Sequence, residues 1–118
     1  MDLYHGTTAD RLEDILTNGL LPQRNWDSGN SPVISLTNSP EQALIEAFII
    51  DTTKAQLQEK NRVAEHYAVI KVITDNYTVK QWQIDEWWIQ ETVHPRDLEV
   101  VIIKDYETVK KEWNMRAR

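Results

Sequence analysis

Leu3-Tyr4-His5-Gly6-Thr7-Thr8 is the stretch around which the rest of the chain is interpreted. A short apolar run ends in His-Gly-Thr and a helical pattern begins directly after it, which indicates a strand that leads straight into a helix. An imidazole at the mouth of a strand can donate or accept a hydrogen bond. A glycine beside it lets another molecule approach the backbone closely. We therefore expect a ligand to bind at His5 and Gly6.

The composition is that of an acidic globular protein. A chain of 118 residues, of which 41% are hydrophobic and 27% charged, most simply forms a single domain over residues 1–118. Its formal net charge of -6 argues against broad nucleic-acid binding, which needs a basic surface. The chain has no cysteine, so thiol nucleophiles, disulfides and thiolate metal sites are excluded.

Targeting and membrane signals are not found in the sequence. No run approaches the ~20 apolar residues of a membrane helix. The N-terminus lacks the basic and apolar regions of a signal peptide. We therefore expect a cytoplasmic protein with no membrane partner.

Hydrophobic periodicity predicts the order β-α-β-α-β-β-β-α, which favours an α+β fold with mainly antiparallel sheets. Strands are expected at residues 2–6, 32–37, 66–73, 86–93 and 98–103, with 66–73 central because it is almost continuously apolar. Helices are expected between Thr8, a plausible N-cap, and Gly19, from Pro40 to about residue 51, and over 105–113. Residues 52–62 are polar and helical or loop, and residues 77–84 are extended or irregular.

The start of the second helix carries the strongest local signal. Ser39 is a good N-cap, Pro40 occupies the first helical position, and Gln42 stands where a capping box needs it. Its expected buried face consists of Ala43, Leu44, Ala47 and Phe48. Small alanines there allow close packing on a sheet.

Three stretches, taken together, resemble the ADP-ribosyltransferase superfamily, on the side of the poly(ADP-ribose) polymerases and the RNA 2′-phosphotransferases. They are Leu3–Thr7 with the helix end Ile15–Leu20, then Val33–Ala43, and last Glu86–Gln90 with Pro95–Val100. The first is similar to the family's histidine-glycine-threonine strand, the second to its strand followed by a helix with small residues, and the third to the glutamate that opens a late strand. Together they cover about half of the chain.

The resemblance implies a compact fold in which two small, mainly antiparallel sheets with flanking helices form an NAD-binding cleft. His5 would bind a ribose hydroxyl, and the Gly6 backbone would bind the nicotinamide carboxamide, with Thr7 completing the motif. Glu86 would bind the nicotinamide ribose and favour an oxocarbenium-like transition state. A carboxylate suits that role because it stabilises positive charge developing on the sugar, as in glycosidases.

The sequence departs from the family pattern in two places. Where the polymerases have a tyrosine that stacks on nicotinamide, this chain has Ser35, so we expect Trp88 to supply the ring from the face that it shares with Glu86. The extra basic residues by which the phosphotransferases grip phosphates are not found as a set. Arg24 and Trp26, on the loop 22–32, could hold phosphate and adenine or could belong to a plain surface loop.

Each of these residues also has a plainer interpretation. His5 could be a hydrogen-bonded strand end, Gly6 could serve the turn into the helix, and Ser35 could be a small packing residue. Glu86 could be a solvated charge, and Glu91 is its rival, although it lies on the opposite face of the strand.

The remaining aromatic residues and histidines are expected to be structural. Trp82, Trp87 and Trp88 are core or interface aromatics by default. His66 and His94 have no metal-like spacing, so no metal is expected.

The sequence therefore predicts an NAD-dependent ADP-ribosyltransferase that uses NAD as substrate and modifies a macromolecular acceptor, a protein being favoured. One alternative is an RNA 2′-phosphotransferase-like enzyme, which would need two or more arginines in the cleft. This alternative would fail if Arg11, Arg24 and Arg62 all pointed away from His5. The other is a non-catalytic module that binds a nucleotide or a protein. Proximity of Glu86 to His5 favours catalysis, whereas separation, or a salt bridge that blocks Glu86, favours a binding role.

Overall fold

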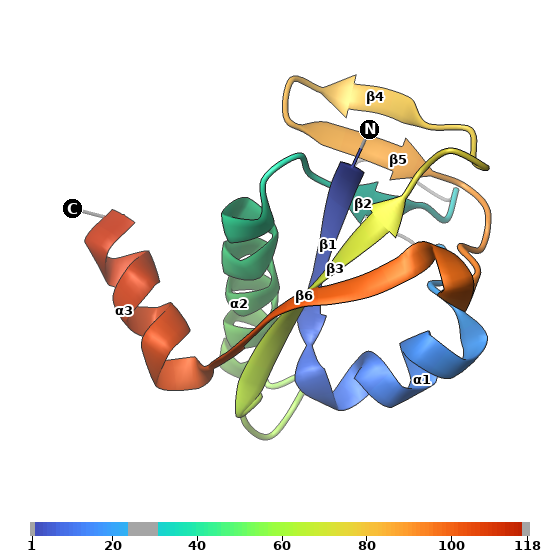
Figure 1. The fold of residues 1–118 in the computed structure, drawn as a ribbon. Helices are drawn as coiled ribbons and strands as arrows, with labels where there is room; N and C mark the ends of the chain where they lie inside the picture. Colours follow the sequence, from blue (N-terminus) through green and yellow to red (C-terminus); the bar gives the residue numbers. More distant parts are fainter. Residues whose placement is uncertain (1, 24–30, 117–118) are drawn as a thin grey trace.

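The computed structural model describes residues 2–23 and 31–116, which form an α+β fold with two three-stranded sheets (Figure 1). Three α-helices accompany the sheets, so the predicted fold class is confirmed at this level. The strands are β1 (Asp2–Thr8), β2 (Ile34–Leu36), β3 (His66–Ile73), β4 (Lys80–Gln83), β5 (Glu86–Ile89) and β6 (Leu98–Asp105). The helices are α1 (Leu12–Asn18), α2 (Pro40–Gln56) and α3 (Tyr106–Arg116), with short 3-10 turns at Ala9–Arg11 and Pro95–Asp97.

The first sheet has the order β1-β3-β6, and all of its strand pairs are antiparallel. Strand β3 is central, as its apolar sequence predicts. Its side chains contribute to two separate hydrophobic cores. Tyr67 and Val69 pack with helix α2, while Ile70 and Val72 pack with Ile15 of helix α1 on the other face. The sheet therefore lies between α2 and α1 (Figure 1).

The second sheet has the order β2-β5-β4 and is also antiparallel. It joins the first sheet at one point. The Tyr4 N–H donates to the Thr37 carbonyl over 2.8 Å, and the Thr37 N–H donates back to Tyr4 over 3.0 Å. Strands β1 and β2 therefore lie side by side near the start of β1, where an isolated β-bridge pairs their backbones.

Helix α2 starts as predicted and packs directly on β1. The Gln42 N–H donates to the Ser39 hydroxyl oxygen over 3.2 Å, so Ser39 caps the helix and Pro40 follows it. The Gln42 side chain donates to Glu46 over 3.3 Å rather than closing a capping box on Ser39. The predicted apolar face of α2 is buried.

Some predicted boundaries differ from the structure. Helix α2 continues to Gln56, past its expected end near residue 51 and into the stretch for which helix or loop was predicted. Thr8, the predicted N-cap, precedes a 3-10 turn, and its side chain makes no capping hydrogen bond. Strand β4 lies within the stretch 77–84, which was predicted to be extended or irregular, and all four of its residues are exposed.

Candidate functional site

The predicted histidine and serine meet where β1 and β2 lie beside each other. His5 Nδ1 lies 3.1 Å from the Ser35 carbonyl oxygen. Since a carbonyl only accepts, Nδ1 is assigned the proton and Nε2 is left as an acceptor. Burial lowers the pKa of His5, the hydrogen bond to Ser35 partly opposes this, and the positive charge of Arg11 lowers it further. The imidazole is therefore neutral near pH 7.

Ser35 also reaches the predicted glutamate. The Ser35 hydroxyl donates to Glu86 Oε2 over 3.1 Å, and the Trp88 indole N–H donates to the same oxygen over 2.6 Å. Neither bond uses Oε1 of Glu86. Two donors from neighbouring strands thus hold one carboxylate oxygen and orient the other. His5, Ser35 and Glu86 form a connected chain although they are far apart in sequence.

An open pocket with a volume of about 710 Å³ lies beside these residues. His5, Gly6, Thr7, Ser35 and Glu86 all line it. Its volume lies within the range of about 300–1,000 Å³ that is typical of small-molecule sites. The structure therefore brings five of the predicted site residues to one pocket.

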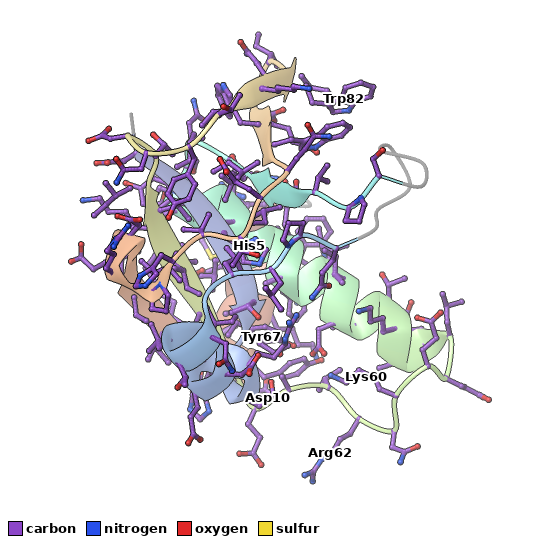
Figure 2. All side chains as sticks on the ribbon, turned by 90° about the vertical axis from the view of Figure 1, so that its right-hand side faces the viewer. His5, Asp10, Lys60, Arg62, Tyr67 and Trp82 are labelled. Carbon is purple, nitrogen blue, oxygen red and sulfur yellow. The ribbon has the colours of Figure 1, made fainter. Side chains whose placement is uncertain are left out.

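The pocket continues along α2, away from Glu86, to Lys54 and Lys60, and Arg11 also lines it. In Figure 2, His5 lies in the middle of the molecule, between Trp82 at one end and Lys60 at the other. Acidic and basic side chains alternate in this part of the pocket, because Asp51 and Glu59 line it together with Lys54 and Lys60.

Gly6 lines the pocket with its backbone atoms. Because glycine has no Cβ, helix α2 can approach the strand closely at this position. A Cβ on Gly6 would lie 1.9 Å from the backbone oxygen of Ala43. Gly6 lies within β1 opposite Val69, so its expected alternative role in the turn into the helix was wrong. Backbone groups alternate in direction along an antiparallel strand. Because Tyr4 directs its N–H and carbonyl to Thr37, Gly6 directs the same groups to that side, which is the edge beside the pocket.

Trp88 has contacts that differ from the predicted stacking role. It is not among the residues that line the pocket along β1 and α2. Its ring stacks on Trp82, with centroids 4.5 Å apart and an interplanar angle of 12°. Trp88 is therefore placed to orient the Glu86 carboxylate, and its partner Trp82 supports it from β4.

The remaining predicted residues lie elsewhere. Glu91 is exposed and accepts from the Thr78 N–H over 3.3 Å, and it does not line the pocket. Arg62 and His66 line a neighbouring pocket of about 510 Å³. His94 accepts from the Arg96 N–H over 3.0 Å, which is a local turn contact. Arg24 and Trp26 lie outside the described residues.

Glu46 is a pocket residue that the sequence reasoning missed. It projects from α2 and lines the same pocket as Glu86. Burial raises the pKa of the Glu46 carboxyl; the hydrogen bond from Gln42 opposes this, and the negative charges of Glu86 and Asp85 raise it further. The helical spacing from Ala43 was a signal that could have placed Glu46 beside the sheet.

Asp51 was missed because its surroundings come from distant residues. Its buried carboxylate accepts from Lys60, from the Ala64 N–H over 2.8 Å and from the Tyr67 hydroxyl over 2.6 Å. Burial opposes ionisation, but these three donors together lower the pKa of Asp51. With its acceptor sites engaged, Asp51 ties α2 to the loop before β3 and is structural.

Two further findings concern residues 2–23 and 31–116. No group of three or more His, Asp or Glu side chains is arranged there to hold a metal ion. None of the helices in these segments is both long and apolar enough to cross a membrane. No protein-family model and no curated protein matches the sequence.

Proposed function

We propose that this protein is an NAD-dependent ADP-ribosyltransferase with an ADP-ribosyltransferase-like fold, in which NAD binds in the pocket beside β1 and β5. The observation that carries the proposal is the chain of contacts from His5 through Ser35 to Glu86. Three separate parts of the sequence, each chosen for its resemblance to that superfamily, supply these residues. Their convergence on one pocket supports a common ligand.

Each group has a chemical role that its geometry allows. His5 Nε2 accepts a hydrogen bond from a ribose hydroxyl, since the imidazole is neutral. The Gly6 N–H and carbonyl form a donor and acceptor pair that matches a carboxamide. Oε1 of Glu86 binds the nicotinamide ribose, and Ser35 and Trp88 keep the carboxylate in place.

The reaction is cleavage of the bond between the ribose C1′ and the nicotinamide nitrogen. The electron pair goes to the nicotinamide ring, which leaves as a neutral molecule, and positive charge develops on the ribose. Glu86 stabilises this charge electrostatically. No step requires a metal ion. One ADP-ribose unit then passes to a macromolecular acceptor, and the acidic surface favours a protein over a nucleic acid.

The experiment is nicotinamide release from NAD, followed by proton NMR, for the wild type and for Glu86→Gln. We expect release by the wild type and a loss of about 10²–10³-fold in the variant, the range for removing one electrostatic stabiliser. Glu91→Gln is the matched control, since it removes the same charge from the rival residue outside the pocket. Equal rates for Glu86→Gln and the wild type would overturn the assignment of Glu86.

The alternatives predict other outcomes. NAD-induced shifts of backbone resonances without nicotinamide release would indicate a non-catalytic nucleotide-binding module. Consumption of NAD only with a 2′-phosphorylated RNA would indicate the phosphotransferase reaction. That reaction has less support here, because only Arg11 of the two described candidate arginines lines the pocket with His5.

A further inference from the structure

Glu46 and Glu86 are two carboxylates that line one pocket from different elements. Glu86 comes from β5 and Glu46 from α2, the helix that packs on Gly6. Their charges are close enough to influence each other. Both carboxylates therefore line the pocket that also contains His5.

The two carboxylates have different surroundings. Glu86 is held by two donors on a single oxygen, from Ser35 and Trp88. Glu46 accepts one long hydrogen bond of 3.3 Å from a neighbouring side chain, Gln42, on its own helix. Neighbouring residues shield its carboxyl in part, while the residue as a whole still reaches solvent. Glu86 is therefore held in one orientation by two donors, whereas Glu46 is held by a single long hydrogen bond and can change its position more easily.

A division of this kind is typical of paired acid and base groups. Where two carboxyl groups share a site, the one whose environment disfavours its charge exchanges the proton, and the other stays charged. A base works best when its pKa lies near the working pH. The raised pKa of Glu46 agrees with this role.

We propose that Glu46 is the general base that removes the proton from the acceptor nucleophile. The inference rests on the proposed function and adds a catalytic residue to it. The acceptor is then a neutral O–H or N–H group, because only such a nucleophile has a proton to lose. Glu46, Asp85 and Glu86 also repel an acceptor that is already an anion, such as a phosphate or a carboxylate.

Both bond changes of this transfer occur at C1′ of the ribose. The C1′–nicotinamide bond breaks and its electron pair stays with nicotinamide. A lone pair of the acceptor oxygen or nitrogen forms the new bond to C1′. The acceptor proton moves to the Glu46 carboxylate and then to water, so that NAD⁺ and the acceptor yield the ADP-ribosylated acceptor, neutral nicotinamide and one proton.

The test compares nucleophiles that do and do not carry a proton. Wild type and Glu46→Gln are incubated with NAD in water, in water with methanol, and in water with azide, and the products are separated by chromatography. Water and methanol must each lose a proton, whereas azide attacks as an anion and loses none. We expect Glu46→Gln to lower the formation of ADP-ribose and of methyl ADP-ribose by about 10²-fold or more, and to leave ADP-ribosyl azide unchanged or increased.

The control is Glu41→Gln, which removes the same charge from the same helix outside the pocket. It should behave as the wild type with all three nucleophiles. Equal loss of all three products in Glu46→Gln would overturn the proposal, since it would indicate weaker NAD binding or altered folding. Unchanged rates for water and methanol would overturn it too. Failure of the proposed function is separable, because the wild type itself would then release no nicotinamide.

Discussion

Gly6 is the residue at which the packing of α2 meets the pocket. Its Cα faces helix α2, and its N–H and carbonyl face the edge of β1 beside the pocket. The nearest atom to an added Cβ is the backbone oxygen of Ala43, which cannot rotate away as a side chain can. Glycine is therefore required here for the close approach of the helix, whatever the ligand.

For Gly6→Ala we expect a loss of about 3 kcal/mol or more of unfolding free energy, at the upper end of what overpacking costs. Urea denaturation followed by tryptophan fluorescence measures it. Adding Ala47→Gly should not restore stability, because the conflict is with the Ala43 backbone and not with the Ala47 methyl group. A Gly6→Ala variant as stable as the wild type would contradict the packing of α2 on β1.

At the scale of elements, the second half of α2 depends on Asp51. The carboxylate is buried and binds Lys60, the Ala64 N–H and the Tyr67 hydroxyl, which belong to the following loop and to β3. A helix, a loop and a strand are thus joined at one group. Losing it leaves the buried tyrosine hydroxyl without its acceptor.

For Asp51→Asn we expect a loss of about 1–3 kcal/mol at pH 7, the usual cost when a buried group loses its partner. The pKa of Asp51 is lowered in the folded state, so its contribution is complete above the unfolded value near 3.9. It is lost as the pH falls through the lower folded value. Urea denaturation should therefore show the difference between wild type and variant shrinking as the pH is lowered through this range.

The control for this series is Asp75→Asn, an exposed turn residue. We expect it to change the unfolding free energy by no more than about 0.5 kcal/mol, both at pH 7 and at the acidic end of the series. A difference between wild type and Asp51→Asn that grows on acidification would show that Asp51 does not stabilise the fold as a carboxylate.

At the scale of the whole molecule, the pocket lies where the two sheets meet. Strands β1 and β2 are joined by the Tyr4–Thr37 bridge and by the contact of His5 with Ser35. Helix α3 lies on the other side of α2 from the pocket-lining strand β1, and its Val109 packs in the core with Phe48 and Tyr67 (Figure 1). Residues of both sheets line the pocket, and no residue of α3 does.

We therefore expect NAD to slow amide hydrogen exchange in β1, β2 and β5, with little local change in α3. Global stabilisation reaches about 2.7 kcal/mol when NAD is present at 100 times its dissociation constant. Hydrogen exchange followed by mass spectrometry, at a temperature where local opening dominates, measures both effects. Protection confined to α3 would place the ligand outside the pocket.

Most of the element order could be predicted from local patterns in the sequence. The central strand β3 has the predicted bounds, because its apolar run contrasts with polar neighbours on both sides. The start of α2 was correct because Ser39 and Pro40 act within one helical turn. The end of α2 was not predicted, because Asp51 is held by residues that follow it in the chain by 9 to 16 positions.

By itself, the sequence determined the fold class, the bounds of β3 and the start of α2, because local patterns mark them. His5, Ser35 and Glu86 were chosen because their stretches resemble a known family. Only the tertiary structure decided that these residues share one pocket, that Trp88 holds Glu86, and that Glu46 joins them. The physical reason is distance along the chain. Propensity and capping act over a few residues, whereas strand pairing sets β1, β2 and β5 side by side and lets α2 pack on Gly6.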